Sequence, residues 1–231
     1  MHALTFGEGK NVIFLHGWGG DVSAFLIFAR RLCAEYRVTA AEFDGFGTTP
    51  EPARPYGVDD YAAATVALMD ERKIDRAVVV GHSFGGRVAM ELAAKYPDRV
   101  AALALVDSAG IKPRRKPSYY VKVFLHKFLK KLGFKGLSGS SDYSVLSPVM
   151  KATFVNVVNY DQTPVLKDIK CPVALFWGRN DTETPPYMAE TIKNGVSDAH
   201  IFWLEGGHFA YLDDAEKFYV ILKSFIAQTA R

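Results

Sequence analysis

Along most of this 231-residue chain, short apolar runs alternate with longer amphipathic stretches. The short runs are apolar at successive positions, which is typical of strands buried on both faces of a parallel sheet. The longer stretches carry apolar residues at helical spacing, so each has one face that must be covered. We therefore predict an α/β fold with a mostly parallel central sheet and helices on both faces. The predicted strands cover residues 11–17, 37–43, 76–80, 100–107, 171–177 and 199–204, and the predicted helices cover residues 21–35, 58–72, 83–96, 185–193 and 214–228.

The alternation breaks once, between residues 110 and 170. This stretch of roughly 60 residues has helical and loop patterns but no clear core strand. It is long enough to form a small unit of its own over one end of the sheet. We predict a core domain built from residues 1–110 and 171–231, with residues 111–170 inserted as a helical cap.

Bulk properties exclude several classes of protein. Lysine and arginine number 28 against 25 acidic residues, and a net charge of +3 is too small to indicate a nucleic-acid partner. No apolar run reaches the roughly 18 residues of a membrane span, and the N-terminus lacks the basic and apolar regions of a secretory leader, so we expect a cytoplasmic protein. The two cysteines, Cys33 and Cys171, form no CxxC pair. We expect both to be buried free thiols, with no disulfide and no metal.

The segment VVVGHSFGGRVAMELA, residues 78–93, joins a predicted strand to a predicted helix through a single serine flanked by glycines. Phosphate-binding turns do not fit these residues. Ser83 stands where the Rossmann motif needs its second glycine, and the lysine that a P-loop requires at the helix start is missing. Residues 81–85 fit G-x-S-x-G instead, the nucleophile elbow, in which a sharp turn strains and exposes the serine. Small flanking residues let strand and helix approach closely, and the helix N-terminus favours negative charge beside the serine.

A serine hydroxyl is a poor nucleophile and needs a base that is held by an acid. The chain order expected with this motif is serine, acid, histidine. Three histidines follow Ser83: His126 in the insertion, His200 at the start of a predicted strand, and His208. We choose His208, because its glycine-rich loop between the last strand and the last helix can carry the ring to the carboxyl edge of the sheet.

Two aspartates are candidates for the acid. Asp181 lies in the loop WGRNDTETPP, which can turn back towards His208, and we favour it for that reason. Asp107 ends the preceding strand at the same edge of the sheet and remains the alternative. An Asx turn or a helix cap ahead of Pro185 would also suit Asp181.

An oxyanion hole needs backbone N–H donors aimed at the developing negative charge. The first expected donor is the N–H of Phe84, which follows the serine. The second is the N–H of Trp18, in the loop HGWGG after the first predicted core strand. The glycines of that loop allow it to fold tightly, although a plain glycine-rich turn would have the same composition.

Together these motifs resemble the α/β-hydrolase fold family. Its blocks are matched, in order, by FLHGWGG, DGFGTT, VVGHSFGGRVAMELAAKYPDRVAALALVD, PVALFWGRNDTETPP and LEGGHFAYLDDAEKF. The resemblance covers nearly the whole chain except the insertion. It points to the branch that holds small carboxylesterases, C–C bond hydrolases and cofactor-free haloperoxidase-like enzymes. It implies Ser83 as nucleophile, Asp181 as acid, His208 as base, Trp18 and Phe84 as oxyanion donors, an insertion that caps the active site, and no metal or organic cofactor.

Two features depart from the usual pattern of that family. The loop after the second strand often reads D-x-P-G-x-G, and here Asp44 stands where proline is usual. The N-terminus is short, so we expect the early antiparallel strands to be trimmed. The residue at the elbow is serine rather than aspartate, which argues against the related haloalkane dehalogenases and epoxide hydrolases.

Aromatic residues near the predicted site indicate an apolar acyl or aryl pocket. The substrate-binding candidates are Trp18, Phe84, Tyr120, Phe124 and Phe154. The insertion is also basic, with nine lysines and arginines and no acidic residue from Lys112 to Lys135. We interpret this stretch as an amphipathic cap helix with a solvated basic side. The alternative is contact with an anionic membrane surface or attraction of an acidic substrate.

These residues predict a serine hydrolase that cleaves carboxylic esters or thioesters of small to medium apolar substrates. A second hypothesis is hydrolysis of a C–C bond in a vinylogous diketone acid by the same three residues, with the basic cap holding the carboxylate. A third is a non-catalytic ligand-binding protein built on this fold. The partner expected in the first two cases is a small molecule, with no nucleic acid involved.

Overall fold

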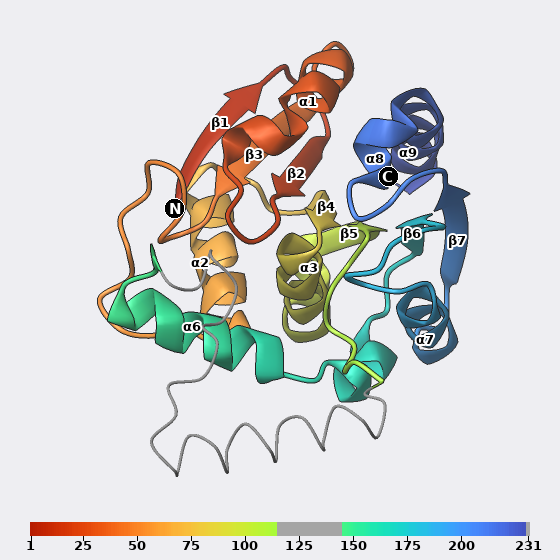
Figure 1. The fold of residues 1–231 in the computed structure, drawn as a ribbon. Coiled ribbons are helices and arrows are strands. Elements are labelled where there is room, and N and C mark those ends of the chain that lie inside the picture. Colours follow the sequence, from red (N-terminus) through yellow and green to blue (C-terminus); the bar gives the residue numbers. More distant parts are fainter. Residues whose placement is uncertain (115–144, 230–231) are drawn as a thin grey trace.

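The computed structural model describes residues 1–114 and 145–229, which form one twisted sheet with helices on both sides (Figure 1). The strands are β1 (His2–Phe6), β2 (Asn11–Leu15), β3 (Arg37–Glu42), β4 (Ala77–His82), β5 (Val100–Val106), β6 (Val173–Gly178) and β7 (Ala199–Leu204). Within these residues they form a seven-stranded sheet in the order β1-β3-β2-β4-β5-β6-β7. β1 runs antiparallel to β3, and every other neighbouring pair is parallel. The predicted fold class is therefore confirmed.

The described residues also form helices, most of which pack on the two faces of this sheet (Figure 1). They are α1 (Leu26–Leu32), α2 (Val58–Glu71), α3 (Phe84–Lys95), α6 (Pro148–Asn159), α7 (Tyr187–Gly195), α8 (Ala210–Asp213) and α9 (Ala215–Thr229), with 3-10 turns η1 (Val22–Phe25), η2 (Pro97–Arg99) and η3 (Thr163–Asp168). α2, α3 and α7 share one hydrophobic core with the sheet, whereas α1 and α9 share the other.

Strand β2 shows why the apolar runs are unbroken. Successive strand residues point to opposite faces of a sheet. Val12 and Phe14 pack into the core beneath α1 and α9, whereas Ile13 and Leu15 pack into the core beneath α2, α3 and α7. All four side chains are at most 1% exposed. A central strand covered on both faces has no position left for a polar side chain.

Differences from the predicted elements lie at the edges of the fold. β1 and α8 were not predicted. β1 is the one antiparallel strand of the described sheet, so trimming of the early strands is not complete. The predicted helix over residues 21–35 is shorter and begins as the 3-10 turn η1. Asp21 still caps it, because its carboxylate accepts the Ser23 N–H at 2.7 Å.

The two cysteines are free, as predicted, but neither is fully buried. Cys33 follows the last turn of α1, and its thiol donates to the Arg30 carbonyl at 3.2 Å. Cys171 precedes β6 at the end of a connecting loop. Both residues lie at element ends rather than in strand or helix interiors, which explains the partial exposure.

Part of the predicted cap is described, from residue 145 onwards, and contains α6 and η3. Ser147 caps α6 by accepting the Met150 N–H at 3.1 Å. The helix is tied to the core through Tyr56, whose N–H donates to the Thr153 hydroxyl at 3.0 Å and whose carbonyl accepts the Asn156 amide at 3.2 Å. These bonds fix α6 beside α2 and α3. The division into core and cap domains stays a prediction.

Candidate active site

Ser83 stands between β4 and α3 with a left-handed backbone, φ 51° and ψ −110°. A residue with a side chain keeps such a conformation only where its surroundings hold it, at a cost of about 1–3 kcal/mol. Here hydrogen bonds hold it. The Ser83 N–H donates to the Val106 carbonyl at 3.0 Å, and the Ser83 carbonyl accepts the N–H groups of Gly86 and Ala109 at 3.1 Å each. The sharp turn expected from the sequence is present.

The glycines around Ser83 are required by close backbone approaches. A Cβ at Gly81 would lie 2.5 Å from the Gly85 carbonyl oxygen. A Cβ at Gly85 would lie 2.1 Å from the carbonyl oxygen of Leu15, at the end of β2. Both distances are far below van der Waals contact. The motif therefore presses α3 against the ends of β4 and β2, and this presents Ser83 at the carboxyl edge of the sheet.

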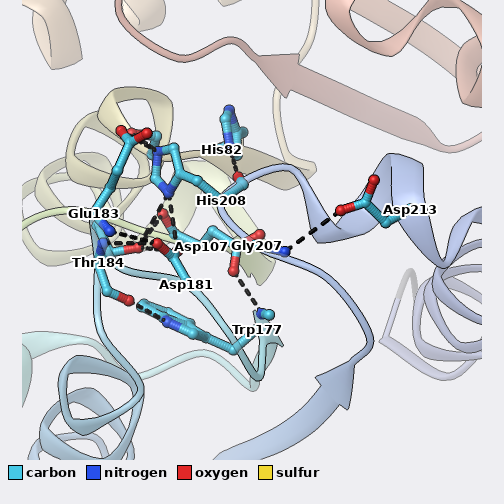
Figure 2. A network of polar contacts seen from close by, with 11 residues as sticks. His82, Asp107, Trp177, Asp181, Glu183, Thr184, Gly207, His208 and Asp213 are labelled. Atoms are coloured by element: carbon cyan, nitrogen blue, oxygen red, sulfur yellow. Dashed lines mark hydrogen bonds and ion pairs between the residues drawn. The ribbon is translucent and has the colours of Figure 1, made fainter.

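His208 and Asp181 reach Ser83 from the loops after β7 and β6. The Ser83 hydroxyl lies 2.9 Å from His208 Nε2, and His208 Nδ1 lies 2.9 Å from Asp181 Oδ2. Because a carboxylate can only accept, Nδ1 carries the proton and Nε2 is free to accept from the serine. Figure 2 shows His208 directed at Asp181, with Thr184 alongside. The structure thus brings together the three residues that the sequence predicted as nucleophile, base and acid.

Asp181 is held ionised by its hydrogen bonds. Burial by itself would raise the pKa of Asp181, but bonds from His208 and Thr184 outweigh it and lower that pKa. The Thr184 hydroxyl donates to Oδ2 at 2.6 Å, and the N–H groups of Glu183 and Thr184 donate to Oδ1 at 2.8 and 3.0 Å. For His208, burial would lower the pKa, but the hydrogen bond and the charge of Asp181 raise it. The pair is therefore arranged to stabilise an imidazolium.

The alternative acid, Asp107, is directed elsewhere. Its Oδ1 accepts the Gly178 N–H at 2.7 Å, and its Oδ2 has no hydrogen-bond partner among the described residues. Burial raises the pKa of Asp107 to about 8. The Nδ1 proton of His208 is directed at Asp181, so the geometry favours Asp181 as the acid. Asp107 instead ties the end of β5 to β6.

Two buried histidines, which the sequence reasoning missed, position the loops around Ser83. The His82 Nε2–H donates to the His208 carbonyl at 2.8 Å, so His82 holds the loop that carries the base. Burial lowers the pKa of His82 to about 3, and the ring is neutral. His16 donates from Nδ1 to the Gly17 carbonyl at 2.7 Å and accepts the Phe43 N–H on Nε2 at 3.1 Å. The sequence signal that could have identified them was their position: His16 immediately precedes Gly17 in HGWGG, and His82 immediately precedes Ser83 in the G-x-S-x-G motif.

The two residues predicted as oxyanion donors, Trp18 and Phe84, line the same cavity as Ser83. Phe84 is the first residue of α3, so its N–H has no acceptor within the helix. Trp18 lies in a tight turn that is closed by the Gly20 N–H donating to the Gly17 carbonyl at 3.0 Å. The contact of Gly85 with Leu15 brings this turn next to the start of α3. A substrate oxygen placed between the two N–H groups would lie at the positive end of the helix dipole.

Two cavities meet at Ser83 and His208. The larger, about 560 Å³, extends along the HGWGG loop to Tyr211, and the smaller, about 230 Å³, lies between α3 and α6. Trp18 and Phe154, two of the predicted substrate-binding residues, border both cavities, and Phe84 borders the smaller one. The Trp18 ring contacts Phe84 and Phe154 edge to face, with centroids 5.3 and 5.1 Å apart.

Several sequence predictions fall outside the described residues. These are the substrate-binding candidates Tyr120 and Phe124, the histidine His126, and most of the basic stretch that ends at Lys135. His200 is among the described residues. It is the second residue of the edge strand β7, and its Nε2 lies 3.5 Å from Asp198 Oδ1.

Among residues 1–114 and 145–229, no three His, Cys, Asp or Glu side chains are placed to hold a metal ion. In the same part of the chain, no helix has the length and apolarity needed to cross a bilayer.

Comparison with known proteins finds a matching family profile and relatives that align with most of this chain. A family profile described as "alpha/beta hydrolase fold" matches residues 10–132. A 2-hydroxy-6-oxo-6-phenylhexa-2,4-dienoate hydrolase of Comamonas testosteroni is 27% identical over 99% of this chain and 91% of its own length. A pimeloyl-[acyl-carrier protein] methyl ester esterase of Neisseria meningitidis is 27% identical over 94% of this chain and 93% of its own.

Two other matches bear on length and fold. A dihydrolipoyllysine-residue acetyltransferase component of an acetoin cleaving system, from Pseudomonas putida, is 27% identical over 91% of this chain, and the match spans only 62% of that longer protein. Among solved structures, an esterase from Exiguobacterium antarcticum superposes with a TM-score of 0.80 at 21% identity, covering 98% of this chain and 95% of the esterase. At that identity the likeness shows the fold alone.

Proposed function

Because this chain belongs to the α/β-hydrolase fold family, we propose that it is a serine hydrolase that cleaves carboxylic esters or thioesters of small to medium size. The observation that carries the proposal is the unbroken chain of hydrogen bonds from Ser83 through His208 to Asp181, with both links at 2.9 Å. A strained serine, a base with a free Nε2 and an ionised acid meet at the junction of two cavities. That combination is the arrangement needed for acyl transfer.

In the acylation step, Ser83 Oγ attacks the substrate carbonyl carbon while His208 Nε2 takes the hydroxyl proton. Asp181 keeps Nδ1 protonated and stabilises the imidazolium that forms. The carbonyl oxygen becomes an oxyanion and accepts the N–H groups of Trp18 and Phe84, which act most strongly where water is excluded. The C–O or C–S bond then breaks, and the leaving alcohol or thiol takes the proton from His208.

Deacylation repeats the sequence with water as the nucleophile. His208 Nε2 takes a proton from the water as its oxygen attacks the acyl carbon, and the proton passes to Ser83 Oγ when the acyl–enzyme bond breaks. The carboxylic acid product is released and the enzyme returns to its starting state. Every proton is carried by His208, so the reaction needs no cofactor.

The cavities support the size of substrate that we propose. The wall that the two cavities share includes the rings of Trp18 and Phe154, which suit an apolar part of the substrate. Phe154 belongs to α6, within the predicted cap of residues 111–170, and we assign that segment the role of covering the site. α6 contributes Val157 and Val158 to the smaller cavity as well.

A second candidate is hydrolysis of a C–C bond by the same three residues. The observation in its favour is the relative of 27% identity that is named as a dienoate hydrolase and matches 99% of this chain. In that reaction the leaving group is a carbanion, which His208 or solvent must protonate. A dienone acid assayed beside p-nitrophenyl esters distinguishes the two functions by which substrate turns over faster.

The decisive test is covalent labelling by a fluorophosphonate probe, followed by an ester and thioester panel. We expect the wild type to be labelled and Ser83→Ala to be neither labelled nor active. Ser224→Ala, which removes a hydroxyl from α9 far from the cavities, is the matched control and should behave as wild type. Intact wild-type protein that takes up no probe would contradict the proposal and favour a ligand-binding protein on this fold.

A further inference from the structure

Arg87 places a buried cation on the wall of the smaller cavity. It is the fourth residue after Ser83, and helix residues four apart share a face. The residue is only 6% exposed, yet it lines the same cavity as Ser83, Phe84 and His208. The proposed reaction gives this cation no task.

One bond of the Arg87 guanidinium is structural. Its Nη1 donates to the Tyr160 carbonyl at 2.7 Å, at the C-terminal end of α6. Arginine has five N–H donors in a planar fork. Among the described residues, no carboxylate lies within 4 Å of this guanidinium and no second hydrogen bond is present. None of its unbonded nitrogens is fully buried, and the residue lines the smaller cavity, so donors are left for a ligand there.

The nearby carboxylates along the chain are held by other groups. Glu91, one turn further along α3, pairs with Lys95 at 3.0 Å and accepts the Gln162 amide at 3.2 Å. Asp161, beside the end of α6, accepts the N–H and the hydroxyl of Thr163 at 3.0 and 2.7 Å. Neither carboxylate contacts the guanidinium. Burial lowers the pKa of Arg87 to about 10 against the opposing charge of Asp161, so the group still carries its charge at neutral pH.

A buried cation with no carboxylate in direct contact is unusual, because removing a charge from water is costly unless an anion pairs with it closely. The planar fork of arginine matches the two oxygens of a carboxylate. We infer that Arg87 binds a substrate carboxylate in the smaller cavity, so that the preferred substrates are short acyl esters that end in a carboxylate. This inference rests on the proposed function, since it places the carboxylate relative to the carbonyl that Ser83 attacks.

The dimensions indicate how long such an acyl chain can be. Four residues of helix separate the Cα atoms of Ser83 and Arg87 by about 6 Å along the axis. The cavity of about 230 Å³ has room for about eight water-sized groups at ~30 Å³ each. A glutaryl group, with five carbons and three oxygens, has that size. A hemiester of a five-carbon dicarboxylic acid is therefore the substrate with which we test the inference.

Glu183 sets the direction in which such a substrate enters. Its carboxylate lines both cavities and lies 3.6 Å from His208 Nε2, at the serine end. It repels a substrate carboxylate from that end, whereas Arg87 attracts it to the far end of the smaller cavity. The two charges together favour one orientation, with the ester carbonyl at Ser83 and the leaving group in the larger cavity.

The test compares two esters of equal size that differ in terminal charge. Monoethyl glutarate carries a carboxylate where the ethyl ester of glutaramic acid carries a neutral amide, and a pH-stat assay follows hydrolysis of both. We expect wild-type kcat/KM to be about 10- to 100-fold higher for the hemiester, the range that a charged hydrogen bond supplies. In Arg87→Gln the ratio should fall to near one. Arg87→Lys, which keeps the charge but not the fork, should give an intermediate ratio.

Arg54→Gln is the charge-matched control, because Arg54 is 65% exposed and lines neither cavity. It should keep the wild-type ratio. A wild-type ratio near one overturns the inference before any variant is needed. A ratio that Arg87→Gln leaves unchanged also overturns it and reduces Arg87 to an anchor for α6. If neither ester is cleaved the inference fails, and fluorophosphonate labelling of Ser83 then shows whether the proposed function fails with it.

Discussion

Replacing Glu183 by glutamine should lower the pKa of the proposed base, His208. The Glu183 carboxylate is 68% exposed and lies 3.6 Å from His208 Nε2. Burial by itself would lower the pKa of His208, but the hydrogen bond with Asp181, then the charges of Asp181 and Glu183, raise it. Two unit charges at this distance interact by about 1 kcal/mol in a water-like dielectric, and exposed ion pairs contribute about 0.2–1 kcal/mol. Since about 1.4 kcal/mol corresponds to one pKa unit, the pKa of His208 should fall by about 0.1 to 0.7.

The assay is the pH dependence of kcat/KM, which reports the free enzyme, on a small neutral ester such as p-nitrophenyl acetate. The base works when it is neutral, so loss of the Glu183 charge should move the rising limb of the profile to lower pH. Glu190→Gln removes an equal charge from an exposed position on α7 and serves as the control. A limb that stays in place, moves to higher pH, or moves equally in Glu190→Gln would refute the reasoning.

Three other substitutions test the site and its supports. Gly85→Ala should destabilise the fold by about 2 kcal/mol or more, because its Cβ would lie 2.1 Å from the Leu15 carbonyl oxygen; an unchanged urea midpoint would contradict this. Asp181→Asn should lower kcat by about 10⁴-fold by losing the correct tautomer of His208, while the circular dichroism spectrum stays native; a kcat within tenfold of wild type would instead point to another acid. His82 is neutral when folded, with a pKa of about 3 against 6.5 for a free side chain, so its stabilising contribution is complete above pH 6.5 and is lost as the pH falls. Between pH 7 and pH 5, His82 should therefore lower the unfolding free energy of the wild type by about 2 kcal/mol, and His82→Gln should not show this part of the decrease. Urea titration at both pH values measures it, and a decrease in the variant as large as in the wild type would count against the neutral buried ring.

The sheet could be predicted because its central strands are buried on both faces. A strand such as β2 can hold only apolar residues, so the run itself marks the strand. β1 had no such pattern, because its sequence HALTF is only five residues long and half-buried. Its partner strand β3 also lies more than 30 residues away along the chain. α8 has four residues, too few to show a helical period. Elements at the rim depend on tertiary partners, which a local pattern does not contain.

The candidate site was likewise predicted only in part. Motif spacing and chain order were sufficient to select Ser83, Asp181 and His208, because the fold fixes which loops meet at the carboxyl edge of the sheet. The roles of His82 and Arg87 were not predicted. Each depends on a carbonyl acceptor 73 or more residues away, His208 for the first and Tyr160 for the second. A residue whose task is set by a distant partner carries no local signature.

The left-handed backbone of Ser83 has a consequence for how this chain can change over evolutionary time. A glycine at this position would adopt φ 51° without strain, so a mutation of Ser83 to glycine would recover part of the about 1–3 kcal/mol that the conformation costs. At position 83, one substitution can therefore remove the proposed activity and stabilise the fold at the same time. Gly81 and Gly85 on either side have no such freedom, because a Cβ at either position would clash with backbone atoms.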